Sequence, residues 1–191
     1  MKNHSNLHSD LKTLVIVAHP DLKTSRINQR LTAELEQRGK VTVHKLYEIY
    51  PDEKIDVGRE QALLLSHDRI VFQFPLQWYS SPSLLKKWID EILYKIIFAD
   101  GHAKADSHAK GRDKLKGKEL LVAISTGGTR SMFQAGGRHN FTISELLRPF
   151  QQTANYVGMI YRQPFVVSGI LEVSDEQLES YAREYADYLE S

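Results

Sequence analysis

Three stretches of the sequence carry side chains suited to binding a planar, anionic ligand, and each follows a short apolar run. They are HPDLKTSRIN at residues 19–28, PLQWY at 75–79 and STGGT at 125–129. The first could bind a phosphate and the second could flank a flat ring. The third could offer backbone hydrogen bonds to the edge of that ring. In combination they suit a flavin mononucleotide.

The first stretch lies where a helix is expected to begin. It matches neither G-x-G-x-x-G nor G-x-x-x-x-G-K-[ST], so it indicates neither a Rossmann dinucleotide turn nor a nucleoside-triphosphate loop. Thr24, Ser25 and Asn28 would lie at the helix N-terminus, whose free N–H groups attract an anion. His19 or Arg26 could add positive charge there. Alternatively, Thr24 or Ser25 only caps the helix, and this stretch alone favours neither reading.

The second and third stretches are open to two readings as well. Trp78 and Tyr79 precede an expected helix start at Ser81-Pro82, so a planar ligand could bury their faces and Gln77 could bind its edge. Trp88, in contrast, lies at helical spacing and is expected in the core. The two glycines of STGGT let a ligand approach the backbone closely. An ordinary glycine turn explains STGGT better when that stretch is considered alone.

Apolar strand patterns and amphipathic helix patterns alternate along the whole chain. Continuous apolar runs are typical of strands covered on both faces, and this alternation predicts a parallel sheet between two helical layers. We expect a flavodoxin-like α/β sandwich with a five-stranded sheet in the order 2-1-3-4-5, in one domain over residues 1–191. The strands are expected at 14–18, 41–47, 70–74, 120–124 and 165–167. The helices are expected at 25–38, 56–67, from Pro82, from Thr142 and at 174–189.

Several local features qualify this pattern. Residues 1–11 are expected to form a flexible N-terminal extension, and the polar segment 99–117 a long surface loop. Pro149 is expected to kink the helix that the capping box Thr142-Ile-Ser-Glu145 opens. Ligands of such sheets bind outside the carboxyl ends of the strands, where the three stretches should meet.

Composition excludes several classes of protein. The formal net charge is +1, which gives no field for nucleic acid or an anionic membrane. The chain has no cysteine, which excludes disulfides, thiolate metal sites and cysteine nucleophiles. No apolar run is long enough to span a membrane, and the polar N-terminus lacks a secretory signal. A cytoplasmic location is therefore expected.

Together, HPDLKTSRIN, FQFPLQWYSSPSLLKKWIDEIL and STGGTRSMF resemble the flavodoxin-fold NAD(P)H:quinone oxidoreductases. This family includes the DT-diaphorase type, bacterial quinone reductases and ancillary subunits of glutathione-gated potassium efflux systems. The likeness covers roughly residues 12–170. The ordered combination of P-L-Q-W-[YF] and T-G-G is more specific than either motif alone.

The resemblance implies a homodimer with the flavin at the subunit interface, where NADPH or NADH and a quinone bind alternately over the same flavin face. It assigns the ribityl phosphate region to His19, Ser25, Arg26, Ile27 and Asn28. The isoalloxazine ring would be lined by Pro75, Leu76, Gln77, Trp78 and Tyr79. The pyrimidine side of the ring would be contacted by Ser125, Thr126, Gly127, Gly128 and Thr129.

The chain departs from the family pattern at positions close to the chemistry. Mammalian members carry a tyrosine and then a histidine that assist hydride transfer, and here the tyrosine position is Phe133. His139 matches the histidine and is the expected catalytic residue, with Asn140 as a rival. Segment 99–117 lacks the aromatic residues that roof the family's substrate site, with Asp100 near the place of a common tyrosine.

The resemblance also bears on the cofactor. The chain lacks the C-terminal portion that holds the adenine half of FAD in mammalian members, which favours FMN, with FAD possible.

Two other functions compete with a quinone reductase. The chain could be the regulatory, ancillary subunit of a glutathione-gated potassium efflux transporter, which a transporter partner would reveal. A metal hydrolase is poorly supported, because the histidines show no H-E-x-x-H or comparable ligand spacing, so no metal site is expected. The histidines considered for it are His4, His8, His19, His102 and His108.

Overall fold

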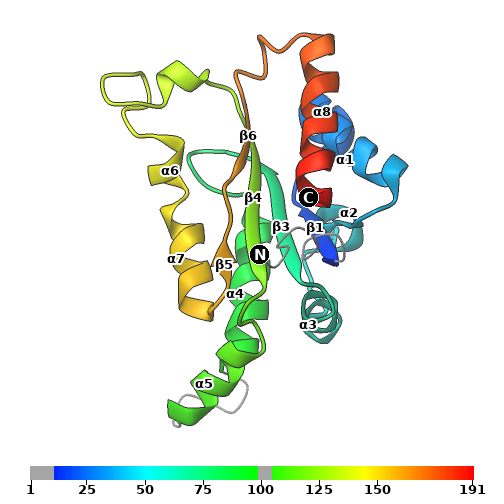
Figure 1. Ribbon diagram of the computed structural model, residues 1–191, viewed down its shortest axis with the longest axis vertical. Helices are drawn as coiled ribbons and strands as arrows, with labels where there is room; N and C mark the ends of the chain where they lie inside the picture. The colour runs from blue at the N-terminus through cyan, green and yellow to red at the C-terminus, as the bar shows by residue number, and fades with distance from the viewer. Residues whose placement is uncertain (1–10, 99–104) are drawn as a thin grey trace, which may run out of the picture.

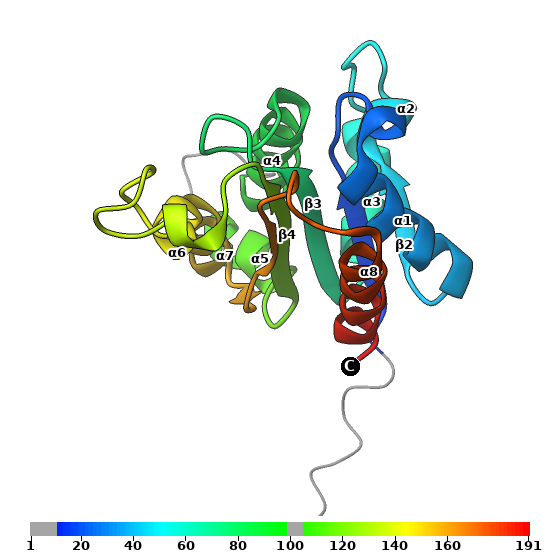
Figure 2. The ribbon, with the colours of Figure 1, turned by 90° about the horizontal axis from the view of Figure 1, so that it is seen from above.

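A computed structural model describes residues 11–98 and 105–191. Its core is a parallel sheet in the order β2-β1-β3-β4-β5, with β6 also paired to β4, between two helical layers (Figures 1 and 2). The expected flavodoxin-like α/β fold and strand order are therefore confirmed. The strands are β1 Thr13–Val17, β2 Thr42–Lys45, β3 Arg69–Pro75, β4 Glu119–Thr126, β5 Ile160–Tyr161 and β6 Phe165–Ser168. The helices are α1 Arg26–Arg38, α2 Leu46–Ile49, α3 Val57–Leu65, α4 Ser83–Ile97, α5 Ala105–Asp113, α6 Ile143–Leu146, α7 Arg148–Val157 and α8 Asp175–Glu190.

Two strands share the edge of the sheet next to β4. The two-residue β5 pairs with Glu119 and Leu120 at the start of β4, and β6 pairs with Ala123 to Thr126 near its end. The strand expected at 165–167 is β6. The expected count of five was wrong, since β5 is too short to give a strand pattern in the sequence.

Alternating strand residues divide the core between the two faces of the sheet. Leu14, Ile16, Phe72 and Phe74 pack with α4 and α7 on one face. Val15, Val17 and Val71 pack with α1 and α8 on the other, and both views place α8 and α7 on opposite sides of β4 (Figures 1 and 2). This division accounts for the continuous apolar runs of β1, β3 and β4, because these strands are covered on both faces.

Most helix ends follow their sequence signals. Ser25 caps α1, and Gly39 ends it in the left-handed conformation. The capping boxes at Thr142 and Ser174 both form. Pro149 lies in the first turn of α7 after a break at Leu147, so the expected kink is a boundary between α6 and α7. The signal at Ser81-Pro82 was wrong by one residue, because α4 has Pro82 as its N-cap and begins at Ser83.

Two segments differ from their expected secondary structure. The strand expected over 41–47 stops at Lys45, because Leu46 turns into the core as the first residue of α2. Residues 105–113 form α5 where a loop was expected. Gly111 permits this, since a Cβ there would lie 2.6 Å from the Ile96 carbonyl oxygen at the end of α4.

The segment around α5 lies away from the expected ligand edge. Helix α5 precedes β4 and lies at the end of the molecule opposite the loops that follow β3 and β4 (Figure 1). Asp100 and the rest of 99–104 lie outside the described residues, as does the expected N-terminal extension except for Leu11.

Helices α1 and α8 run side by side and are joined by a ladder of ion pairs. Arg26, Arg30 and Arg38 bind Asp175, Glu179 and Asp187, each pair separated by 149 positions, at 2.5, 2.6 and 2.6 Å. Glu34 lies between the rungs and accepts hydrogen bonds from Arg30 and Arg38. These hydrogen bonds hold the pKa of Glu34 below its usual value. The constant separation shows that the two helices are parallel and in register.

A carboxylate is buried on the other face of the sheet. Glu60 of α3 is fully buried and accepts hydrogen bonds from Trp88 Nε1 and the Tyr50 hydroxyl, both at 2.7 Å. His44 Nε2 lies 3.0 Å from Glu60 Oε2, at ion-pair distance but without hydrogen-bond geometry. Burial alone would raise the pKa of Glu60, but these partners outweigh it and leave that pKa below its usual value.

Among the described residues, no helix combines the length and the apolar character needed to cross a lipid bilayer.

Candidate functional site

The three sequence stretches meet at the carboxyl ends of β1, β3 and β4, which are neighbours in the sheet. Asn28 Nδ2 donates to Ser125 Oγ at 2.9 Å and thereby joins the first stretch to the third. The Leu76 N–H donates to the Ser125 carbonyl at 2.9 Å, which joins the second stretch to the third. Their expected convergence is therefore a feature of the fold.

The N-terminus of α1 combines both readings of the first stretch. Ser25 Oγ accepts a hydrogen bond from the Asn28 N–H at 3.2 Å, so Ser25 does cap the helix. In the described part of the chain, the N–H groups of Arg26 and Ile27 have no acceptor, which leaves donors for an anion. The Ile27 side chain itself is buried against the sheet.

Neither of the two side chains expected to add positive charge, His19 and Arg26, is free to do so. Burial holds the pKa of His19 below its usual value, although Asp21 opposes the shift, so the imidazole is neutral near neutral pH. His19 Nδ1 also accepts the Asp21 N–H at 3.1 Å. Arg26 is committed to α8 through Asp175 and the Val173 carbonyl. The helix N-terminus therefore offers an anion a positive potential that neither His19 nor Arg26 supplies.

The second stretch forms a two-residue turn that holds aromatic rings in solvent. Gln77 and Ser80 exchange backbone hydrogen bonds at 3.0 and 2.9 Å across Trp78 and Tyr79. Both central residues have positive φ, 46° and 64°, a conformation that is strained for side chains other than glycine. Trp78 is 93% exposed and Tyr79 49%. Pro75 ends β3, and Leu76 is the last residue before the turn that packs against the core. The rings of Trp78 and Tyr79 lie outside the core.

The third stretch is divided between buried supports and an open backbone. Ser125 and Thr126 are buried, and Thr126 Oγ1 donates to the Gly128 carbonyl at 2.8 Å. Their side chains therefore brace the loop. Gly127 has open space where a Cβ would be. Thr129 lies next to Gly169 after β6, where an added Cβ would come within 3.1 Å of Thr129 Cγ2.

His139 packs into this loop between two aromatic rings. It stacks on Phe133 with centroids 4.3 Å apart and an interplanar angle of 19°. The Tyr79 hydroxyl lies 3.3 Å from His139 Nδ1. A Cβ on Gly128 would lie 2.6 Å from His139 Nε2, so glycine is needed there to admit the ring. Asn140, the rival catalytic residue, is exposed with a φ of 59° and has no hydrogen bond to Tyr79 in the described structure.

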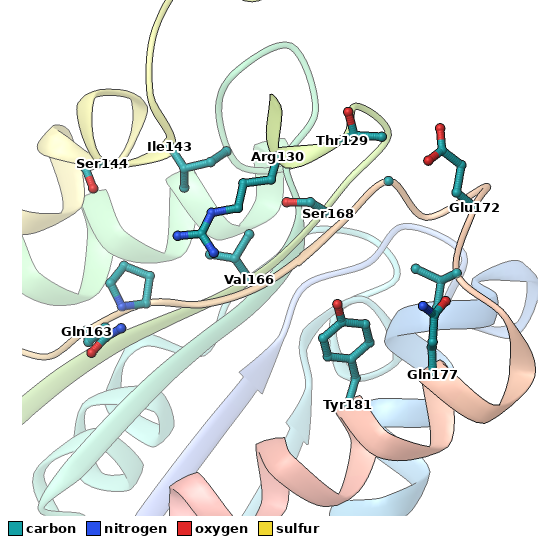
Figure 3. Close-up of a pocket in the computed structure, with 13 residues that line it drawn as sticks. Thr129, Arg130, Ile143, Ser144, Gln163, Val166, Ser168, Glu172, Gln177 and Tyr181 are labelled. Carbon is teal, nitrogen blue, oxygen red and sulfur yellow. The ribbon is translucent and has the colours of Figure 1, made fainter. Parts of the chain in front are cut away.

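A pocket in the described part of the chain lies beside this site rather than in it. It has a volume of about 650 Å³ and lies between β6, α6 and α8, and Thr129 is the one residue it shares with the three stretches (Figure 3). Arg130, Gln163, Ser168, Gln177 and Tyr181 give it a polar lining. The sequence has no motif for these residues, because their spacing follows from how β6 and α8 pack.

One supporting residue was missed although the sequence marks it. Gln73 interrupts the apolar strand RIVFQFP and is fully buried. Its Nε2 donates to the Asn28 carbonyl at 3.1 Å and to Thr32 Oγ1 at 2.9 Å. A polar residue inside a buried strand needs a partner, so Gln73 signals a contact that fixes the start of α1.

The histidines do not form a metal centre in the described residues, where no group of three or more His, Asp or Glu side chains is arranged to hold an ion. His4, His8 and His102 lie outside those residues.

Known proteins share this fold and much of this sequence. The chain is 51% identical over 182 residues to the uncharacterized NAD(P)H oxidoreductase YrkL of Bacillus subtilis, covering 95% of this chain and 99% of that protein. It is 39% identical over 178 residues to the Escherichia coli glutathione-regulated potassium-efflux system ancillary protein KefG, covering 93% and 92%.

Solved structures are also similar to this chain in fold and sequence. General stress protein 14 of Treponema denticola in complex with FMN superposes with a TM-score of 0.83 and 38% identity, covering 93% of this chain and 97% of that one. An NADPH-quinone reductase from P. pentosaceus gives a TM-score of 0.79 and 38% identity, covering 94% and 98%. A family model described as a flavodoxin-like fold matches residues 11–189. Because the family model matches nearly all of its length, the chain belongs to the flavodoxin-like fold family.

Proposed function

We propose that the protein is an FMN-dependent NAD(P)H:quinone oxidoreductase. In the reaction, NAD(P)H, one proton and a quinone give NAD(P)⁺ and a hydroquinone. The oxidised nicotinamide leaves before the quinone binds, in a ping-pong sequence at one site. Bound FMN would supply the two-electron redox chemistry, and the protein would bind, orient and cover the reactants.

The turn at Trp78 and Tyr79 carries this proposal. Two aromatic residues in strained backbone conformations, one almost wholly in solvent, contribute nothing to the core. Tyr79 reaches His139, which lies against Gly128 next to the open backbone of Gly127, so a flat ring could stack on the aromatic turn and hydrogen bond at its edge. The relatives named as NAD(P)H oxidoreductase, quinone reductase and FMN complex support the assignment.

The residues around α1 fit the phosphate end of FMN. The N–H groups of Arg26 and Ile27 would bind the phosphate with the helix dipole. Asn28 Oδ1 is buried without a partner in the described residues, and a ribityl hydroxyl is a donor that could satisfy it. Ser25 and Ser125 would fix Asn28 in place, while His19 would remain neutral.

The finer assignments belong to the same proposal. FMN is favoured over FAD, because Arg26 is bound to α8 and adds no charge for a second phosphate. A cytoplasmic homodimer would cover the exposed face of Trp78 at the subunit interface.

Colour and turnover test the proposal together. Purified protein should be yellow, or become yellow with added FMN, and should oxidise NADPH or NADH when menadione is supplied. Light scattering should give the mass of a dimer. Protein that binds neither FMN nor FAD would contradict the proposed function.

Replacement of His139 by alanine should lower menadione turnover by on the order of 10²-fold while FMN affinity is retained. The reason is that His139 Nε2 is the titratable side-chain atom at the Gly128 edge of the site. Asn140→Ala is the matched control, since Asn140 is adjacent in sequence but exposed. Normal turnover in His139→Ala would assign the role to Asn140 or to no side chain.

A second candidate is an ancillary subunit of a glutathione-gated potassium efflux transporter, and the similarity to KefG over 92% of that protein favours it. Co-purification with a potassium efflux transporter from the native membrane would support it. This role is compatible with enzyme activity, so the two candidates need separate assays.

A further inference from the structure

The imidazole of His139 is held on three sides, and each contact acts on a different part of it. Phe133, itself only 7% exposed, stacks on the ring face. Gly128 leaves room for Nε2. The Tyr79 hydroxyl reaches Nδ1 from the turn after β3, and the two rings meet edge to face with centroids 5.7 Å apart.

The contacts of His139 differ in which property of the imidazole they fix, its plane or the positions of its two nitrogens. Phe133 offers a flat surface but no donor, so it fixes the plane of the imidazole and leaves the ring free to exchange its two nitrogens by a flip. Only a polar partner distinguishes Nδ1 from Nε2. Within the described residues, the one polar side chain at the imidazole is Tyr79.

We propose that Tyr79 is a positioning residue whose hydroxyl donates to His139 Nδ1, fixing the Nε2–H tautomer with Nε2 against Gly128. A tyrosine hydroxyl is a donor at neutral pH, and a neutral imidazole that accepts at Nδ1 must carry its proton on Nε2. The Nε2–H then points a donor into the edge of the site, where the proposed function needs one for charge that develops on the bound reactants.

This role of Tyr79 explains why the turn at Trp78 and Tyr79 keeps a strained backbone. A positive φ of 64° at Tyr79 is unfavourable for a bulky residue, and it is the conformation in which the phenol reaches back to His139. The backbone of His139 is fixed separately, because its N–H donates to the Met132 carbonyl at 3.0 Å. The hydroxyl therefore controls the ring and its tautomer without controlling the loop.

The inference concerns residues of the same site, so it rests on the proposed function for its catalytic meaning but not for its test. The variant is Tyr79→Phe, which removes one oxygen and keeps the aromatic contact. Tyr156→Phe is the matched control, since Tyr156 is also half-exposed and lies on α7 with Arg112 over its ring.

The first readout is the tautomer itself. Two-bond ¹H–¹⁵N spectra, assigned to His139 by the signal lost in His139→Gln, should show mainly Nε2–H in the parent protein and in Tyr156→Phe. In Tyr79→Phe the two tautomers should become mixed. An unchanged His139 signal in Tyr79→Phe would overturn the inference, whether or not the protein reduces quinones.

The second readout is turnover of FMN-loaded protein. Tyr79→Phe should lower kcat by about tenfold with KM for NADPH and FMN affinity unchanged, because orientation and not binding is lost. If Tyr79→Phe changes the tautomer of His139 but the parent protein does not reduce quinones, the proposed function is contradicted and the inference about Tyr79 is supported.

Discussion

Replacement of Glu60 by leucine is expected to lower the free energy of unfolding by about 3 kcal/mol. Leucine has a similar volume, so little packing is lost, but Trp88 Nε1–H, the Tyr50 hydroxyl and His44 lose their shared acceptor inside the protein. Urea unfolding near neutral pH measures the change. Glu48→Leu, at the exposed position of α2, is the control and should change stability little.

Replacement of Glu60 by glutamine should cost less, about 1 kcal/mol, because the amide oxygen still accepts from Trp88 and Tyr50 can accept from the amide. The variants should therefore rank parent, glutamine, leucine in decreasing stability. Equal stability of the leucine variant and the parent would show that the cluster contributes nothing net.

Acid should remove this difference between parent and glutamine variant. The pKa of Glu60 is lower in the folded protein than its usual 4.5, so the carboxylate stabilises the fold fully above that value. The contribution is lost as the pH falls through the lower, folded-state pKa. Parent and variant should converge in stability there, and a gap that stays constant into acid would contradict the charged role of Glu60.

Replacement of Trp78 by glycine is expected to stabilise the protein while weakening its cofactor. Glycine adopts a φ of 46° without steric cost, so unfolding should require about 1 kcal/mol more, since the exposed ring contributes no core packing. FMN affinity should fall by about 1–3 kcal/mol because a stacking surface is removed. Thermal unfolding and fluorescence titration with FMN measure the two effects.

Trp78→Ala separates the two effects, since alanine also loses the ring but keeps the Cβ that makes this conformation unfavourable. It should lose as much FMN affinity as Trp78→Gly and gain no stability. Unchanged FMN affinity in both variants would make Trp78 a residue of the turn only.

Periodic and buried features of the fold could be predicted from the sequence. Runs such as Leu14 to Ala18 and the stripe of α8 are set by burial, which leaves a pattern in the residues themselves. Helix α5 and strand β5 could not be predicted this way. Helix α5 has a polar, glycine-containing sequence and packs through Gly111 on the backbone of α4, and β5 consists of two residues paired to β4.

The candidate site was predictable as a set of loops and not as a set of contacts. The chemistry of residues 19–28, 75–79 and 125–129 indicated where the strands end. It did not distinguish Trp78, which is open to solvent, from Ser125, which is buried as a brace. The contact between Tyr79 and His139 depends on the positive φ values of Trp78 and Tyr79. Neither residue type predicts a positive φ.

The register between α1 and α8 has a consequence for how the chain is made. The apolar side of α1, with Ile27, Leu31 and Leu35, is completed by a helix 149 positions later. On the ribosome, that side of the nascent sheet stays open to water until almost all described elements have been synthesised. We therefore expect the emerging chain to need chaperone protection at α1, and its final folding step to be the docking of α8.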